Sequence, residues 1–480
     1  MTRFPKALKI SLFAFGGLAG ILVLAALALF LVDVESYKPR VEAMASSRLG
    51  MDVTVEGQLH IGIIPELHVT LEHVRMRNRG SEIAFVEKAD LAIEFLSLLR
   101  QNLRFGNIAL KRARLSIELG RDGKYNFEKP PGSEAAFPAL DIPQVSFAEL
   151  IVAYVNKGSD DAFEARSCNG ELSRVRHPGK AKFLSRLSLS GQFTCRELAG
   201  KKALISDVRF SVEATEGVFD FKPFTMRAFG GEGSGALRVD RSRAVPVVQL
   251  DYALRKFRIE EYFKTLLPGK SASGPMDFSI TLAMRGPTRG ELRRSARGEM
   301  SLSGTNLTLA GVDLDKELSR YAASQRFNLF DLTAFVFAGP LGLALTKGTQ
   351  LASLSHPDGG TTPIRTVVSK WKVEKGVAHA SDVAWTTREN RLALHGALDF
   401  VDDEFDDVVV ALIDSNGCAK VRQRIRGPFG NPVVEKPDVL TAITGPVRKL
   451  LDRARELVSD RKSTRLNSSH IQKSRMPSSA

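Results

Sequence analysis

The chain has 480 residues, of which 43% are hydrophobic and 25% are charged, a composition typical of folded protein. Its formal net charge is +14, but residues 1–9 supply +3 of this and residues 461–480 supply +5, which leaves +6 over the body at 33–460. So mild an excess excludes a dedicated nucleic-acid-binding protein. The three cysteines exclude a disulfide-dense scaffold.

An uncharged apolar segment, Ile10–Val32, begins close to the N-terminus. As a helix, its 23 residues would span about 34 Å, compared with roughly 30 Å of bilayer hydrocarbon. The alternative is a signal peptide cleaved near Ala26-Leu27-Ala28, but the apolar run is longer than a signal peptide needs. We therefore expect an uncleaved, single-pass anchor. Because Lys and Arg precede it, residues 1–9 are expected in the cytoplasm and the body on the opposite side of the membrane.

A short helix is expected after the anchor, because Pro39 suits a first helical turn and Gly50 suits a helix C-terminus. Beyond Gly50, apolar and polar residues alternate with a period of two, which indicates strands with one apolar and one polar face. Such alternation favours antiparallel sheet over parallel sheet covered on both faces. The clearest alternating segments are 52–61, 67–72, 90–95, 113–119, 186–193 and 277–284.

Helical segments are few. The sequence predicts helices at Arg258–Leu267, Asp313–Arg326 and Val447–Val458, the last of them amphipathic. So few helices cannot cover that many half-apolar strands. Either two sheets pack face to face as a sandwich, or one sheet curls and leaves an apolar trough. Composition alone favours the sandwich.

The strand pattern contains a weak internal echo at a constant offset of 37 residues. A repeated β unit would explain it, and so would chance. The matching pairs are Ile108 and Val145, Leu110 and Phe147, Leu115 and Val152, and Ile117 and Tyr154.

Composition also suggests where the parts of the chain begin and end. A Pro/Gly-rich linker at 131–143 is expected to separate a β region at 33–130 from a β-rich body at 144–436. The amphipathic helix lies in a C-terminal segment at 437–460. Residues 461–480 are rich in serine and contain no acid, and they resemble translated adapter sequence or a disordered tail.

Candidate motifs for enzymes and for metal or nucleotide sites lack features that such sites require. Gly231–Ala236 fits the pattern GxGxxA, but the residues after it indicate strand or turn instead of the required helix. His60, His68 and His73 have no cysteine or carboxylate at metal-ligand spacing. The acidic run Asp402–Asp407 lacks the glycine-bearing spacing of a calcium loop. We therefore expect no enzymatic activity, no cofactor and no bound metal.

Two of the cysteines could form a disulfide. Cys168 and Cys195 lie in adjacent strand candidates around a turn near His177–Lys182, and direct pairing would centre their hairpin at about 181–182. The pairing requires a compartment that permits disulfides. Cys418 is left over, with packing as its expected role.

A series of short motifs follows the anchor in a fixed order. The N-terminal motifs are Tyr37-Lys38-Pro39, Gly50, Val53-Thr54-Val55-Glu56-Gly57-Gln58-Leu59, Pro65, Leu71-Glu72-His73-Val74, Ala89-Asp90-Leu91-Ala92-Ile93, Leu98-Leu99, Ile108-Ala109-Leu110 and Asp122-Gly123-Lys124-Tyr125-Asn126-Phe127. The C-terminal motifs are Phe229-Gly230-Gly231-Glu232-Gly233-Ser234-Gly235, Gly417-Cys418-Ala419 and Gly427-Pro428-Phe429-Gly430-Asn431-Pro432. In this order they resemble the AsmA family of bacterial envelope proteins over most of 1–460. Met51 departs from the family, which commonly has a basic residue there.

The resemblance implies a protein anchored in the inner membrane of a Gram-negative bacterium by residues 10–32, with its body in the periplasm. Its larger relatives, the TamB-like and YhdP-like proteins, form long curled β-sheets with an apolar groove and are implicated in moving phospholipid between the two membranes. This shifts the expected fold from the sandwich to a curled, mostly antiparallel sheet with an apolar concave face and a few short helices.

The expected function is accordingly the binding or transfer of phospholipid between the inner and outer membranes, without catalysis. The alternative is a scaffold or regulator of outer-membrane assembly that acts through envelope protein partners and carries no lipid. An apolar groove would suit acyl chains, which lose about 0.8 kcal/mol for each CH₂ exposed to water. The candidate lining residues are Val53, Val55, Leu59, Ile61, Leu91, Ile93, Leu115 and Ile117. Ordinary core packing is an equally good account of any one of them.

Overall fold

The structure is a computed structural model. It describes residues 35, 38–62, 68–93, 105–127, 139–158, 161–179, 183–200, 204–266, 271–311, 313–316, 360–413, 417–436 and 438–439. The expected anchor at 10–32, the helix Val447–Val458 and the tail at 461–480 lie outside these ranges, as does most of the linker at 131–143. Within these ranges, no helix combines the length and the apolar character needed to cross a membrane.

The chain divides into two compact units. Unit 1 comprises residues 1–266 and 277–298, and unit 2 comprises residues 267–276 and 299–480. Both units are mainly β, and the named helices of the described residues all belong to unit 1. The named α-helices are α2 (Lys38–Leu49), α4 (Ile259–Leu266) and α5 (Arg289–Ser295).

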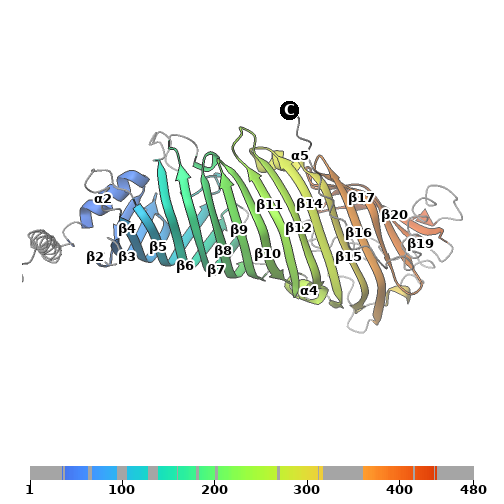
Figure 1. Ribbon diagram of the computed structural model, residues 1–480. Helices are drawn as coiled ribbons and strands as arrows, with labels where there is room; N and C mark the ends of the chain where they lie inside the picture. The colour runs from blue at the N-terminus through green and yellow to red at the C-terminus, as the bar shows by residue number, and fades with distance from the viewer. Residues whose placement is uncertain are drawn as a thin grey trace, which may run out of the picture. The chain divides into compact units, whose positions relative to one another are not determined.

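In unit 1, strands that follow one another in the chain lie side by side (Figure 1). They are β1 (Asp52–Val55), β2 (Leu59–Gly62), β3 (His68–Asn78), β4 (Ser81–Ile93), β5 (Phe105–Leu119), β6 (Leu140–Asn156), β7 (Asp161–His177), β8 (Ser188–Gly200), β9 (Leu204–Thr215), β10 (Val218–Ala228), β11 (Gly231–Asp240), β12 (Val247–Arg258) and most of β14 (Pro275–Arg285). A short 3-10 helix, Phe183–Ser185, precedes β8. Pairing is antiparallel from β3 to β5 and from β6 to β12. These pairings join the strands into one sheet, so the two-sheet sandwich considered as the alternative is wrong for unit 1.

Strands β5 and β6 pair in parallel, and their register explains the echo in the sequence. Ile108 lies opposite Val145 and Ile117 opposite Tyr154, and the register keeps an offset of 37 residues along the whole pair. In a parallel pair of strands, residues that lie opposite each other point to the same face of the sheet. Both strands therefore carry the same apolar pattern, in the same direction along the chain. The echo therefore reflects strand pairing.

Helix α2 covers the first edge of the sheet. Gly50 ends the helix with a φ of +69°, a left-handed conformation that suits glycine. Val53 N donates a hydrogen bond to Ser46 Oγ at 2.9 Å, and Val55 N donates to Glu42 Oε1 at 2.6 Å. These side chains give outward-facing backbone donors of β1 a partner, so the edge is closed against pairing with another chain.

Unit 2 contains a second set of strands. They are β13 (Ser271–Ser273), most of β15 (Arg297–Ala310), β16 (Thr361–Glu374), β17 (Val377–Thr386), β18 (Arg391–Asp399), β19 (Glu404–Ile413), β20 (Ala419–Pro428), β21 (Val433–Val434) and β22 (Asp438–Val439). Strands β16 to β20 pair antiparallel in chain order. Trp385, Leu392 and Val410 are fully buried, so the apolar face of these strands is closed from solvent.

Candidate functional site

The most distinctive feature of unit 1 is a row of aromatic residues and glycines that crosses seven strands, one residue per strand. Each member lies directly opposite the next in the strand register, so all of them share one face of the sheet. Along β6 to β12 the row consists of Phe147, Gly170, Phe193, Phe210, Phe224, Gly235 and Tyr252. We call it the aromatic row. Because it runs at right angles to the strands, it follows the long axis of the sheet.

The aromatic rings of the row are in contact with one another. The centroid of Phe193 lies 5.2 Å from that of Phe147 and 4.8 Å from that of Phe210, with the second pair stacked. Phe224 lies 6.1 Å from Phe210 on one side and 6.1 Å from Tyr252 on the other. These spacings are within the range of favourable aromatic pairs. The rings thus form a continuous apolar strip from β6 to β12.

The two glycines of the row make this continuity feasible. A Cβ atom on Gly170 would lie 2.6 Å from Cζ of Phe147 and 2.8 Å from the carbonyl oxygen of Gln192. The Phe147 ring therefore crosses the space above β7 and reaches Phe193 on β8. Gly235 has the same role on β11, where a Cβ would lie 2.8 Å from the Cα of Tyr252. A ring covering a strand glycine in this way is a known means of stabilising a sheet.

The glycine at position 170 should be intolerant of a side chain. We expect Gly170→Ala to lower the free energy of unfolding by about 1–3 kcal/mol, because the methyl group forces Phe147 and the β8 backbone apart. The matched control is Gly106→Ala in β5, where the nearest atom to an added Cβ is the Ala92 Cβ at 3.4 Å. That variant should change stability by no more than about 0.5 kcal/mol. Urea unfolding followed by circular dichroism measures both, and equal effects would contradict this account of the row.

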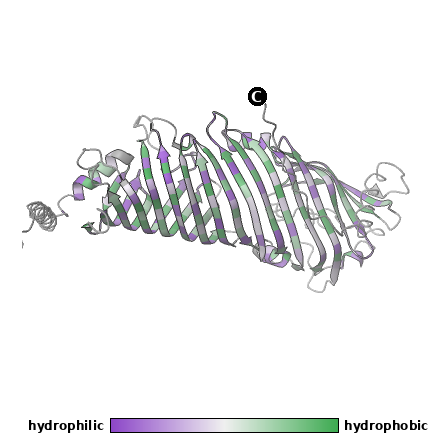
Figure 2. Ribbon diagram, in the orientation of Figure 1, coloured by the Kyte–Doolittle hydropathy of each residue, from purple (hydrophilic) through white to green (hydrophobic). Residues whose placement is uncertain are grey.

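A second apolar row lies beside the first on the same face. It continues across β2 to β12 without a polar residue. Its members are Ile61, Val69, Leu91, Ile108, Val145, Leu172, Gly191, Val212, Phe221, Leu237 and Leu250. Figure 2 shows the corresponding alternation of hydrophobic and hydrophilic residues along the strands of unit 1. Together the two rows make what we call the apolar face of unit 1.

The apolar face is only partly covered. Phe147, Phe193, Phe210 and Phe224 are half-buried, in contrast to the fully buried core side chains of unit 2. Phe163, on β7, is 42% exposed. A monomeric soluble protein seldom exposes a contiguous apolar surface without a function for it. The face is therefore the candidate functional site.

Tyr252 ends the aromatic row with a buried hydroxyl group. The side chain is 9% exposed, and Tyr252 Oη has no hydrogen-bond partner within the described ranges. Burial raises the pKa of Tyr252 from its ordinary value of 10.0 to about 12. The neutral phenol is therefore strongly favoured in the folded state.

Replacing Tyr252 with phenylalanine should leave the fold intact and increase its stability at high pH. At neutral pH we expect a gain of up to about 1 kcal/mol from removing an unsatisfied donor. The raised pKa means that wild-type stability is fully present below pH 10 and is lost as the pH rises towards 12, because the unfolded phenol ionises first. The stability advantage of Tyr252→Phe should therefore grow by about 1 kcal/mol between pH 9 and pH 11. An advantage that is the same at both pH values would contradict the burial of this hydroxyl.

The predicted lining residues fall into two groups. Val53, Val55 and Leu59 are buried in a small core beneath Val41 and Ala45 of α2. The others are less covered or lie further along the sheet. Ile61 is 39% exposed, and Leu91, Leu115 and Ile117 are half-buried. Ile93 lies in β4 opposite Phe105. The first group thus closes the α2 end of the sheet, and Ile61, Leu91, Leu115 and Ile117 continue the apolar face.

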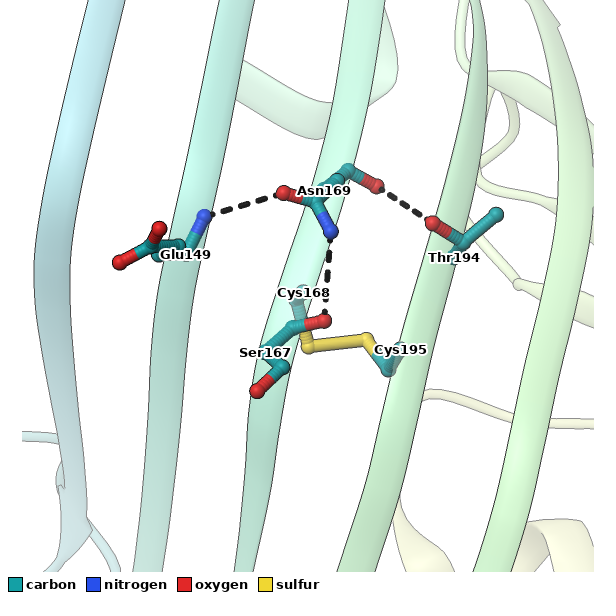
Figure 3. The surroundings of a disulfide bond; sticks show 6 residues. All are labelled: Glu149, Ser167, Cys168, Asn169, Thr194 and Cys195. Atoms are coloured by element: carbon teal, nitrogen blue, oxygen red, sulfur yellow. Dashed lines mark hydrogen bonds between the residues drawn. A yellow bond between two sulfur atoms is a disulfide. The ribbon is translucent and has the colours of Figure 1, made fainter.

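The structure joins Cys168 to Cys195, the pair for which the sequence suggested a disulfide. They lie directly opposite each other on β7 and β8. Figure 3 shows how Asn169 fixes the same region, accepting a hydrogen bond from Glu149 N at 3.1 Å. Thr194 Oγ1 donates to the Asn169 carbonyl oxygen at 3.4 Å. The disulfide and this network together hold β6, β7 and β8 beside the centre of the aromatic row.

The opposite face of the sheet is covered by charged pairs. Arg112 donates to both carboxylate oxygens of Glu87 at 2.6 Å. Arg166 donates to Glu164 at 2.5 Å, and this hydrogen bond lowers the pKa of the Glu164 carboxyl group. Such exposed pairs contribute little to stability but keep this face wet. Within the ranges described, no group of three or more His, Cys, Asp and Glu side chains is placed to hold a metal ion.

Sequence reasoning missed the aromatic row. Phenylalanine is abundant, with 28 residues, and that abundance was the available signal. Phe147, Phe193 and Phe210 come from three different strands, so their alignment appears only once the register of the sheet is known.

Comparison with known proteins agrees with the sheet and its N-terminal motifs. No curated protein is significantly similar to the chain. The model of the AsmA family matches residues 4–133 and 165–382, which together make up more than two thirds of the sequence. The chain belongs to the AsmA family.

Proposed function

We propose that the protein binds phospholipid through its acyl chains on the apolar face of unit 1 and transfers it between the inner and outer membranes. The observation that carries this proposal is the half-buried aromatic row, a continuous apolar strip of seven strands. Membership of an envelope-associated family supports it. The role needs no catalysis, because shielding CH₂ groups from water already lowers their free energy by about 0.8 kcal/mol each.

The dimensions of the row suit acyl chains. From β6 to β12 there are six inter-strand spacings of about 4.8 Å, or roughly 29 Å in total. This equals the hydrocarbon thickness of a bilayer, in which two acyl chains meet end to end. The row is therefore longer than one extended acyl chain, so a chain lying along it could contact apolar side chains over its whole length.

The backbone supports a concave apolar face. Exposed non-glycine residues with positive φ interrupt six strands of unit 1, with their side chains on the polar side. They are His73, Arg112, Glu149, Ser167, Arg174, Asp207 and Lys256. Glu149, Ser167 and Asp207 coincide with register shifts, the mark of β-bulges, which bend a strand. An extra residue on the polar side lengthens that side, so the bend places the apolar face inside. We propose the curled, trough-like sheet on this basis.

The sequence and the disulfide support a proposed location. We propose that residues 10–32 anchor the chain in the inner membrane and that the body lies in the periplasm. The Cys168–Cys195 bond supports a compartment that permits disulfides, which the bacterial periplasm does. Envelope proteins that receive the lipid are the expected partners.

The scaffold alternative expects a filled apolar core. Unit 2 fits that description, because Trp385, Leu392 and Val410 are fully buried. Unit 1 does not fit it, since the four phenylalanine rings of its aromatic row are half-buried. We therefore assign lipid binding to unit 1 and a structural role to unit 2.

A transfer assay tests the function directly. The full chain is reconstituted into donor liposomes that contain a fluorescent phospholipid, and acceptor liposomes are added. We expect the protein to raise the initial transfer rate at least about tenfold over protein-free liposomes, a change that corresponds to about 1.4 kcal/mol. A rate equal to that of protein-free liposomes would favour the scaffold.

A further inference from the structure

Six arginines gather at one edge of unit 1. They come from the loop between β11 and β12, from the end of β14 and from helix α5. We call Arg241, Arg243, Arg285, Arg289, Arg293 and Arg294 the arginine edge. Gly286 N donates to the Pro246 carbonyl oxygen at 3.0 Å, which places the start of β12 beside the end of β14. Figure 1 shows α5 at this edge of the strands.

The positive charge of the arginine edge is poorly balanced. The segments that carry these arginines, 240–246 and 285–295, contain six arginines and two acids, Asp240 and Glu291, a formal excess of four positive charges. Arg243 approaches Asp240 at 3.8 Å, but its side chain is 80% exposed. In the part of the chain that the structure describes, Arg241, Arg289 and Arg294 form no ion pair and are exposed.

Fold stability does not explain this arrangement. Arg289 begins α5, where the helix dipole disfavours a positive charge. Arg289 and Arg293 are also four residues apart on the helix, so they repel each other. Arg293 and Arg294, in the last turn, are the two whose charge the helix favours. The positive charge of the other arginines lowers the stability of the fold unless a bound anion offsets it.

One member of the arginine edge, Arg241, directly continues the alternation of the apolar face. On β11, Gly235, Leu237 and Val239 alternate on that face, and Arg241 is the next residue of the alternation. The strand backbone still pairs there, because Arg241 N donates to the Gly217 carbonyl oxygen at 2.8 Å. Arg241 lies two residues beyond Val239, a distance of about 7 Å along an extended strand. A molecule that is apolar at one end and anionic at the other would contact both.

We propose that the arginine edge binds the phosphate group of the lipid whose acyl chains lie on the apolar face of unit 1. The cargo is therefore a phosphate-bearing diacyl lipid, and a neutral lipid with the same acyl chains is disfavoured. A guanidinium group suits this role because it pairs with phosphate through two parallel N–H donors. The inference rests on the proposed function, since it assumes that acyl chains occupy the apolar face.

Competition between two lipids with identical acyl chains tests the inference. The full chain in detergent is incubated with equal amounts of dipalmitoyl phosphatidylglycerol and dipalmitoylglycerol, and the retained lipids are counted by native mass spectrometry. We expect at least tenfold more of the phosphate-bearing lipid. The variant with Arg241, Arg243, Arg289 and Arg294 changed to Gln should bring the ratio close to one while still retaining lipid.

The matched control changes four arginines of the polar face, Arg166, Arg209, Arg227 and Arg255, to Gln. It removes the same charge and should keep the wild-type ratio. In the wild type, the ratio should fall with added salt, because exposed charges are screened. Inorganic phosphate at about 10 mM should leave the ratio unchanged, since it lacks the acyl contacts.

The outcomes separate the two proposals. If the wild type retains neither lipid, the proposed function fails. Equal retention of both lipids by the wild type overturns the arginine edge and leaves acyl-chain binding standing. An arginine-edge variant that keeps the preference also overturns it, and so does displacement by inorganic phosphate, which would make the edge a site for free phosphate.

Discussion

The double substitution Phe193→Asp and Phe210→Asp should reduce the phospholipid retained by the purified full chain at least tenfold. These two residues lie directly opposite each other in the centre of the aromatic row, with stacked rings 4.8 Å apart. Two carboxylates there would have to be desolvated when an acyl chain binds, which is a large cost for unpaired charges. Tenfold corresponds to about 1.4 kcal/mol, a lower limit for that cost. Lipid extraction and native mass spectrometry measure the loss.

The register offers a close control for this variant. Gln192 and Ser211 are the neighbouring cross-strand pair and point to the opposite face of the same two strands. Gln192→Asp with Ser211→Asp introduces the same charges, and the same repulsion between them, at the same level of the sheet. It should retain lipid as the wild type does. If both variants lose lipid equally, the loss reflects damage to the sheet. That result would contradict the role of the apolar face in binding lipid.

Removing the disulfide should have the second largest effect. We expect Cys168→Ser with Cys195→Ser to lower the free energy of unfolding by about 3 kcal/mol. The bond joins residues 27 apart in the chain, and closing a loop of that length restricts the unfolded state by about 3–4 kcal/mol. The substitution also removes the covalent link between β7 and β8, beside Phe193 of the aromatic row.

Urea unfolding of the full chain, with and without a thiol reductant, measures this effect. Reductant should destabilise the wild type to the level of the double serine variant and leave that variant unchanged. Cys418→Ser controls for the loss of a thiol and should shift stability by no more than about 0.5 kcal/mol. A double serine variant as stable as the oxidised wild type would show that the bond does not constrain the chain.

Much of the fold could be predicted from local pattern. Alternation with a period of two marked the strands, and Pro39 and Gly50 marked the beginning and the end of helix α2. Even the parallel pair β5 and β6 left a trace in the sequence, the offset of 37 residues. These features could be predicted because they depend on residues close together in the chain or on a repeated pattern.

The candidate site was harder to predict because it depends on register across strands. Phe147 and Tyr252 are 105 residues apart in sequence, yet they belong to one row. Gly170 and Gly235 look like breaks in the apolar pattern, and only the packing of neighbouring rings shows that they are parts of it. Strand sequences specify which face is apolar but not which residues of different strands meet.

The N-terminal lining candidates show the complementary difficulty. Val53 and Val55 have the alternation of an open apolar face, but α2 packs over them through Val41 and Ala45. Alternation reports that a residue is shielded from water on one side and does not identify what shields it. The half-buried positions further along the sheet are accordingly the better candidates for contact with lipid.

Site-specific photo-crosslinking in living cells tests the central claim most directly. A photoreactive phenylalanine analogue is placed in the full chain at Phe210 or at Ser211, which lie on opposite faces of β9. After irradiation, the purified protein is analysed by mass spectrometry for phospholipid adducts. The account predicts adducts at position 210 and none at position 211. Adducts at neither position, or at both in equal yield, would contradict phospholipid binding on the apolar face of unit 1.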